Sequence, residues 1–379
     1  IAVRPLVIMS SVLPRTSAAY NYSKNLIGPK VGGFYAYIYF AGRLTIAIFG
    51  ISFAQYLASL VPELGNPLAM KIIGILVLSL FYLINLFGIK AAAKIQNIMV
   101  VVLLTGLVSY VAFGLPHVTA DFFRAPDFFR GGFDGFYTAL SLLFFAVSGA
   151  YIITDFAPSI DRPQQTIKKV IVMVTLGVCV LYMLIGVVAS GVIPIEQAAN
   201  QPLSVTAEII FPNQFFRIFF IVGGAIGALV TTLNSSFVWY SKALIGPCAD
   251  GLFPKSFAKK NKRDVPYVLM TVFYIFGLVP IIFSIDLAVL SKIAVGMTIF
   301  SLIIPMAGIL KLEEKYKEAW DASKYSHKYS LTRRKVMLIL TYIIFGTQVA
   351  YLFYSNPPLA NGIIILYVGA VLIYLKLKK

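Results

Sequence analysis

The chain has 379 residues, of which 59% are hydrophobic and only 12% are charged, and its mean hydropathy is +0.86. Ordinary soluble domains are about 45–50% apolar and about 25% charged, so this composition excludes a soluble enzyme, a disordered chain and a disulfide-rich secreted domain. The two cysteines and two histidines lie in separate segments, which argues against a disulfide framework, a metal cluster or a histidine-based site. The sequence therefore predicts an all-α polytopic membrane protein.

Ten segments are long and apolar enough to be membrane-spanning helices. Such a helix needs about 20 mainly apolar residues, and these runs lack the period-two alternation of barrel strands. An eleventh segment, 1–13, is apolar but only about half as long as a span. The ten expected spans are 31–60, 70–89, 95–114, 135–157, 167–193, 214–246, 265–284, 287–310, 335–354 and 359–376.

The connections between these spans alternate in charge. The chain carries 32 Lys and Arg against 15 Asp and Glu, a formal net charge of +17. Basic residues concentrate in short loops on the cytoplasmic side of a membrane. We therefore expect the basic connections and the C-terminus to be cytoplasmic, so no nucleic-acid partner is needed to explain the charge. The basic connections are 15–30, 90–94, 162–169, 255–263, 311–334 and the tail 376–379.

The same alternation applies to the N-terminal segment. Segment 1–13 would run inward and end at the cytoplasmic side. Its first residue, Ile1, is not methionine, and the segment lacks the charged start and cleavage site of a signal peptide. We expect an upstream segment that contains the rest of this half-span and at least one further helix.

Span 135–157 carries a candidate break. Irregular backbone inside a membrane is tolerated where it lines a cavity, so interrupted spans indicate binding sites. Ser148 and Gly149 lie near the middle of this span. Glycine has no Cβ and serine can bond nearby backbone groups, so the helix could unwind here. Close helix packing by small residues is the alternative.

Span 214–246 contains a polar run after three glycines. Gly223, Gly224 and Gly227 are expected to allow close helix packing. The polar side chains that follow are oxygen ligands suited to a substrate ammonium or a Na⁺ ion, although interhelical hydrogen bonding would also explain them. They are Thr231, Thr232, Asn234, Ser235 and Ser236.

Arg43 is a charge placed deep in span 31–60. At 1.5 Å per residue, its position about 12 residues into the span puts it near the bilayer centre. Charges at this depth are costly and usually face a cavity or a partner. Arg43 is therefore expected either to bind a carboxylate or to form a structural ion pair.

Three motifs resemble the amino-acid permeases of the amino acid–polyamine–organocation superfamily. The resemblance covers essentially the whole chain, and the third motif is the most specific. In sequence letters, the motifs are LPRTSAAY at 13–20 with GP at 28–29 and GGF at 32–34, FFAVSG at 144–149 with RP at 162–163, and DGLFP at 250–254 with FA at 257–258, Asn261 and VP at 265–266.

The resemblance implies a fold of two inverted five-helix repeats with two extra C-terminal helices, truncated at its N-terminus. Residues 1–114 would hold the end of the second helix and helices three to five. Residues 115–134 would be an extracellular loop and 135–310 the second repeat, helices six to ten. Residues 311–334 would form a cytoplasmic loop and 335–379 helices eleven and twelve.

The resemblance also implies site residues. Phe145 is similar to the aromatic residue that closes over the substrate, while Ala146, Val147, Ser148 and Gly149 would present unwound backbone to the substrate amine. Asn234 and Ser235 would line the opposite wall. Arg43 joins the substrate candidates because it lies deep in span 31–60. Thr231, Thr232 and Ser236 are the candidates for a coupling ion. Several positions depart from the pattern of many relatives. Among them, Leu103 stands where they carry a lysine that replaces a coupling Na⁺.

The implied function is secondary active transport of an amino acid or related amine by alternating access. Its partners would be the small-molecule substrate and the lipid bilayer of a bacterial-type plasma membrane; the sequence says nothing of a partner subunit. No cofactor is expected beyond a coupling Na⁺ or H⁺, and symport and exchange both remain open. A non-transporting scaffold or sensor, or a truncated inactive copy of the same fold, is the alternative. A membrane-embedded enzyme is not expected, because the spans offer no catalytic triad and no metal-ligand spacing.

Overall fold

The computed structural model describes residues 3–43, 46–120, 122–124, 129, 131–198 and 201–377. Within its helices, the side chains of 89–92, 138, 141–142, 144–148, 159, 195 and 288 fall outside the description. Every regular element in the described ranges is a helix. The prediction of an all-α polytopic membrane protein is therefore confirmed, whereas the division into two repeats stays a prediction.

The helices follow one another with short connections. The longer α-helices are α1 (Arg4–Val12), α3 (Pro29–Arg43), α4 (Ala47–Leu60), α5 (Pro67–Leu86), α6 (Ile89–Gly114), α7 (Gly132–Val147), α8 (Pro163–Gly191), α12 (Gly227–Ala249), α13 (Tyr267–Ile282), α14 (Leu287–Ile303), α17 (Leu331–Ser355) and α18 (Pro358–Leu377). The short α-helices are α2 (Ala18–Tyr22), α9 (Ile195–Ala198), α10 (Ser204–Ile210), α11 (Gln214–Phe219), α15 (Leu312–Lys315) and α16 (Lys317–Asp321). The 3₁₀ segments are η3 (Pro62–Gly65), η4 (Leu115–His117), η5 (Phe122–Arg124), η7 (Ser148–Ser159), η9 (Lys255–Ala258) and η10 (Ile304–Leu310), and the π segments are η1 (Ser23–Ile27) and η8 (Phe220–Ile226).

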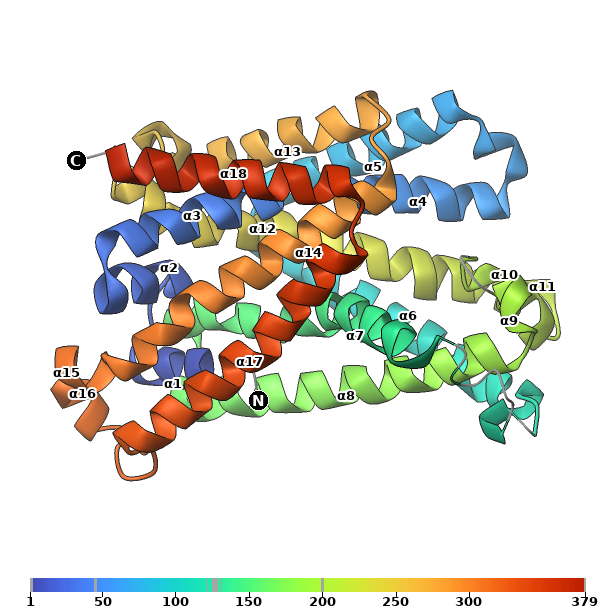
Figure 1. Ribbon diagram of the computed structural model, residues 1–379. Coiled ribbons are helices and arrows are strands. Elements are labelled where there is room, and N and C mark those ends of the chain that lie inside the picture. The colour runs from blue at the N-terminus through green and yellow to red at the C-terminus, as the bar shows by residue number, and fades with distance from the viewer. Residues whose placement is uncertain are drawn as a thin grey trace.

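The long helices form a bundle with two distinct ends. Figure 1 shows α2, α15, α16 and the C-terminus at one end, and α9, α10 and α11 at the other. The first end therefore gathers segments from three of the basic connections named above. We call it the basic end.

Helix starts follow from local sequence. Proline occupies the first position of α3, α5, α8 and α18, where its fixed φ suits a helix and its missing N–H costs no intrahelical bond. Asn66 caps α5 by accepting a hydrogen bond from the backbone N–H of Ala69 at 2.8 Å. Asn213 caps α11 in the same way, from the N–H of Phe216 at 3.1 Å. These caps satisfy backbone donors that the first helical turn leaves free.

Eight helical stretches in the described residues are long and apolar enough to cross a membrane. They correspond to eight of the ten expected spans, with α3 and α4 falling in a single stretch, 29–60. Of the other two, α13 is apolar but has only 16 residues. The last expected span, 135–157, is divided between α7 and η7.

The division of span 135–157 lies at the predicted position. The α-helix ends at Val147, and a 12-residue 3₁₀ helix runs from Ser148 to Ser159. Such 3₁₀ runs longer than 3–4 residues are uncommon, and in mid-helix they often mark a functional hinge. We expected the backbone to unwind here. In the structure it remains helical and changes from an α-helix to a 3₁₀ helix.

The interior and the lipid-facing surface are carried by different helices. Helix α12 is central, and its Leu233, Phe237 and Leu244 side chains are fully buried. Helix α8 instead exposes apolar residues along its length, including Met173 and Met183. In a soluble protein such a surface would drive aggregation, so its natural solvent is the hydrocarbon of a bilayer.

Two glycine contacts allow helices to approach closely. A Cβ on Gly106 of α6 would lie 2.8 Å from the backbone nitrogen of Gly224 in η8. A Cβ on Gly50 of α4 would lie 2.9 Å from the carbonyl oxygen of Gly74 in α5. Small residues are the usual means of close packing between membrane helices. The packing role predicted for Gly224 is confirmed.

Candidate functional site

A cavity of about 760 Å³ lies against the broken span. Its walls come from α3, α4, α6, η7, α8, α12 and α14. A concave, largely apolar space with a few convergent polar groups is the usual form of a small-molecule site. The polar and charged side chains that line it are Arg43, Gln96, Tyr151, Tyr182, Thr232, Asn234, Ser235, Trp239, Tyr240 and Thr298.

Arg43 ends α3 at the wall of this cavity and is only 4% exposed. Its Nη2 donates to the hydroxyl of Tyr151 in η7 at 3.4 Å, and its Nη1 donates to Oγ1 of Thr298 in α14 at 3.5 Å. Its Nε is buried without a hydrogen-bond partner. No carboxylate in the described chain pairs with it within 4.0 Å, so the structural ion pair considered above is not formed there.

Asn234 of α12 connects three helices at the cavity wall. Its Oδ1 accepts from Nδ2 of Asn85 in α5 at 3.0 Å, and its Nδ2 donates to Oε1 of Gln96 in α6 at 3.0 Å. Asn85 also donates to the carbonyl of Phe81 at 2.8 Å. Asn234 therefore lines the cavity and also makes the interhelical hydrogen bonds that were the alternative explanation for its presence.

The hydroxyls beside Asn234 bond to their own helix. Thr231 and Thr232 donate to the carbonyl of Ala228 at 3.0 and 2.8 Å, and Ser236 donates to the carbonyl of Thr232 at 2.6 Å. Such back-bonding satisfies the hydroxyl within a helix. Thr232 lines the cavity, whereas Thr231 and Ser236 are buried in helix packing. The three candidates for a coupling ion therefore do not share one surface.

The eight candidate substrate residues fall into two groups. Arg43, Gly149, Asn234 and Ser235 line the same cavity, although they come from three separate parts of the sequence. The side chains of Phe145, Ala146, Val147 and Ser148 lie outside the described residues. The structure thus brings together every candidate whose surroundings it describes.

Several cavity residues were not singled out from the sequence. Tyr151, Trp239 and Thr298 line the cavity and contact or surround Arg43, with Trp239 placing its ring 5.0 Å from the guanidinium carbon. A neutral aromatic or hydroxyl residue inside an apolar span gives no sequence signal of its own. Helix periodicity could have identified Trp239, because it lies four residues after Ser235 and therefore on the same face of the helix.

The first and third motifs meet at the basic end of the bundle. Tyr20 of α2 donates its hydroxyl hydrogen to Asp250 at 2.6 Å, and Lys24 pairs with the same carboxylate at 2.8 Å. Partial burial acts to raise the pKa of Asp250, but the hydrogen bonds from Lys24 and Tyr20 outweigh it and hold the pKa below its ordinary value. Burial and then the Asp250 hydrogen bond raise the pKa of Tyr20, so its hydroxyl stays a donor. We call these three residues the Asp250 cluster.

The Asp250 cluster predicts a pH-dependent contribution to stability. We expect Asp250→Asn to lower the unfolding free energy at pH 7 by no more than about 1 kcal/mol, because partly exposed ion pairs are weak. A carboxylate whose folded pKa is depressed stabilises the fold above its unfolded pKa, near 3.9, and loses that contribution as the pH falls through the folded value. The melting temperatures of wild type and variant should therefore converge below about pH 4.

Melting curves in detergent between pH 7 and pH 3 measure this convergence. The control is Asp264→Asn, which breaks the more exposed Lys260–Asp264 pair and should shift melting less. A gap between wild type and Asp250→Asn that stays constant down to pH 3 would contradict the prediction.

Comparisons with known proteins agree with the three motifs. A family model described as amino acid permease matches residues 1–374. The chain is 27% identical over 197 residues to the branched-chain amino acid permease BcaP of Bacillus subtilis, which is 51% of this chain and 41% of that protein. It is 24% identical over 278 residues to BcaP of Lactococcus lactis, 68% of this chain and 60% of that protein.

A third relative is named for other substrates. The chain is 22% identical over 271 residues to the D-serine/D-alanine/glycine transporter of Escherichia coli, covering 65% of this chain and 54% of that protein. The chain thus spans between 41% and 60% of the length of these three relatives. The family match confirms the resemblance drawn from the motifs.

Proposed function

Because the chain belongs to the amino acid permease family, we propose that it acts in secondary active transport, carrying an amino acid or related amine across a membrane by alternating access. The family is one of permeases, so the chain is a member of a transporter family and not of an enzyme family. Transport of this kind requires no covalent chemistry. It requires a central site, a division of the bundle into parts that can move, and access from each side in turn.

The observation that carries the proposal is the position of the cavity. It lies where the α-helix of span 135–157 becomes 3₁₀, and its other walls come from helices before and after that span. Discontinuous helices at the middle of a bundle are typical of transporter binding sites. We propose that Phe145, Ala146, Val147, Ser148, Gly149, Asn234 and Ser235 contact the substrate there, together with Arg43.

The charge distribution supports an orientation. The basic connections include the segments holding α2, α15 and α16, which share one end of the bundle with the C-terminus (Figure 1). By the positive-inside rule this end faces the cytoplasm. We propose a bacterial-type plasma membrane as its location. A coupling Na⁺ in the cavity would use the hydroxyl oxygen of Thr232, the one of the three candidates that lines it, because a lone pair remains available after the hydroxyl hydrogen is donated. H⁺ coupling and exchange are the other modes.

A cysteine placed in the cavity tests alternating access. The protein, produced with its complete natural chain, would carry Ser235→Cys in a background of Cys179→Ser and Cys248→Ala, and would be reconstituted in liposomes. We expect a membrane-impermeant maleimide to label position 235 from one face, and a transported amino acid to change the labelling rate. The control is Ser256→Cys in the exposed segment η9, which should label at the same rate with or without amino acid.

The same preparation measures uptake of radiolabelled amino acids. Saturable uptake together with substrate-dependent labelling supports the proposal. Saturable binding without flux would instead favour the scaffold or sensor alternative. The absence of both binding and uptake across a panel of neutral, acidic and basic amino acids would overturn the proposed function.

A further inference from the structure

Arg43 is a buried cation with no carboxylate within 4.0 Å of it in the described chain. Its hydrogen-bond acceptors, Tyr151 and Thr298, are neutral and lie at 3.4 and 3.5 Å, the long end of hydrogen-bonding distance. Aromatic faces surround the guanidinium carbon, with Tyr39 at 4.4 Å and Tyr240 at 5.2 Å from it. Cation–π contacts offset part of the cost of burying a charge, but they do not neutralise it.

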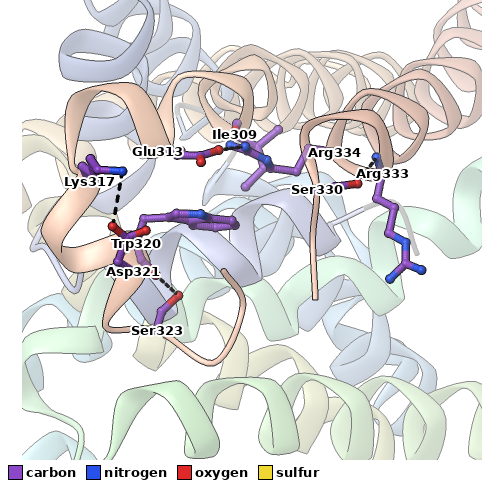
Figure 2. Close-up of polar contacts among 9 residues, drawn as sticks. All are labelled: Ile309, Glu313, Lys317, Trp320, Asp321, Ser323, Ser330, Arg333 and Arg334. Carbon is purple, nitrogen blue, oxygen red and sulfur yellow. Dashed lines mark hydrogen bonds and ion pairs between the residues drawn. The ribbon is translucent and has the colours of Figure 1, made fainter. Parts of the chain in front are cut away.

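A second buried arginine in the same chain has the carboxylate partner that Arg43 lacks. Arg334 is 1% exposed, and its Nη2 pairs with the carboxylate of Glu313, as Figure 2 shows. Its Nη1 also donates to the carbonyl of Ile309 at 3.2 Å, and its guanidinium carbon lies 4.7 Å from the ring centre of Trp320. Both arginines have an aromatic neighbour and an unbonded Nε. Only Arg334 has a carboxylate.

The guanidinium of Arg43 faces the space that a bound molecule would occupy. Arg43 is the one charged side chain among the described residues that line it. Asp155 of η7 is buried too and lies near enough to be attracted electrostatically by Arg43. Its Oδ1 accepts instead from the backbone N–H of Ala18 at 2.7 Å, it makes no ion pair with Arg43, and it does not line the cavity. A buried ion pair with one partner removed is strongly unfavourable, so the occupant of the cavity is the natural source of the missing negative charge.

We propose that the site takes an amino acid with a side-chain carboxylate, and that Arg43 is the residue that determines this specificity. The inference rests on the proposed transport function. An ordinary zwitterionic amino acid brings equal positive and negative charge, so it leaves the cavity with the net charge of Arg43. An acidic amino acid brings one additional negative charge and makes the loaded cavity neutral. The planar guanidinium can bind that carboxylate through two parallel hydrogen bonds.

Glutamate and glutamine provide a matched pair of substrates, because they have nearly the same shape and differ in charge. With the complete protein in liposomes, we expect kcat/KM for uptake of L-glutamate to exceed that of L-glutamine at least tenfold. Arg43→Met keeps an unbranched side chain similar to the aliphatic stem of arginine but removes the guanidinium and its charge. It should lower kcat/KM for glutamate by about thirtyfold or more, since truncating one partner of a buried charge pair costs at least about 2 kcal/mol, and should bring the ratio of glutamate to glutamine kcat/KM close to one.

Two further variants test whether the guanidinium shape matters and whether removing an arginine elsewhere has the same effect. Arg43→Lys keeps the charge without the planar fork and should give an intermediate glutamate preference. Arg217→Met removes an arginine that pairs with the exposed Glu208 at 3.6 Å, far along the chain from Arg43, and should leave the ratio of glutamate to glutamine uptake unchanged.

The outcomes distinguish this inference from the function on which it rests. Wild-type uptake of glutamine or leucine in preference to glutamate, with the same preference in Arg43→Met, would overturn the inference and leave transport standing. If no amino acid is taken up, the transport proposal fails, and calorimetric titration of the detergent-solubilised protein with L-glutamate still decides the inference. Binding by wild type that Arg43→Met abolishes would support it, and absence of glutamate binding would overturn it.

Discussion

Replacing Arg334 by methionine is expected to lower the free energy of unfolding by about 2–4 kcal/mol, one of the largest stability effects of any single substitution outside the cavity. The guanidinium joins the start of α17 to the carbonyl of Ile309 at the end of η10 and to Glu313 in α15 (Figure 2). Methionine retains most of the apolar volume but none of these bonds. It leaves the Ile309 carbonyl without this donor and the Trp320 ring without its cation.

The neighbouring arginine provides the control. Arg333 is exposed, and it donates to the carbonyl of Lys328 at 2.9 Å while its backbone N–H bonds to Ser330 at 3.4 Å. Arg333→Met keeps the backbone bond and should change stability by no more than about 0.5 kcal/mol. Apparent melting temperatures in detergent, followed by tryptophan fluorescence, compare the two variants. Equal melting of Arg334→Met and Arg333→Met would show that the contacts of Arg334 with Glu313 and Ile309 do not stabilise this loop.

The fold was largely predictable because the bilayer imposes a simple rule on the sequence. Segments such as 167–193 and 335–354 are long enough to cross it, and the structure has a spanning helix at each. Segment 265–284 was equally apolar, but its helix covers only Tyr267–Ile282 because Pro266 precedes it and Ser284 adopts a positive φ of 52° just after it. Apolar composition predicts where a helix lies in the bilayer more securely than where its backbone changes direction.

The broken span shows both the reach and the limit of sequence patterns. Ser148 and Gly149 predicted a change in the helix at the right residues, since serine and glycine both weaken an α-helix locally. The pattern could not predict whether the backbone unwinds or becomes 3₁₀, because that choice depends on how the surrounding helices pack. The structure has the 3₁₀ form over Ser148–Ser159.

The candidate site was predictable only through its unusual residues. Arg43 and Asn234 were identified because charge and amide groups are costly in a membrane interior, and both line the cavity. Tyr151 and Thr298 carry no such signal, and their roles depend on the distance between helices far apart in the chain. The meeting of the first and third motifs through Tyr20 and Asp250 was likewise not apparent from their spacing.

Asn234→Leu is expected to reduce substrate uptake by at least tenfold while the protein still inserts into the membrane. Leucine nearly matches asparagine in shape but offers no hydrogen bonds, so Asn85 loses one of its two acceptors and Gln96 loses its donor. Each buried polar group left without its partner costs about 1–3 kcal/mol. The cost falls on the contacts that hold α5 and α6 against α12 at the cavity wall, and the position of that wall should therefore become less defined.

The matched control is Asn97→Leu, which makes the same chemical change on α6 one residue after Gln96, at an exposed position. Because leucine is suited to lipid contact, we expect Asn97→Leu to insert and transport as wild type does. Initial rates of uptake in liposomes, normalised to the amount of reconstituted protein, measure both variants. Asn234→Asp separates the two roles of the residue, since its carboxylate can still accept from Asn85 but cannot donate to Gln96. Wild-type uptake by Asn234→Leu would show that this amide is needed neither for the substrate nor for the cavity wall, and the site would then have to be sought among the other cavity residues.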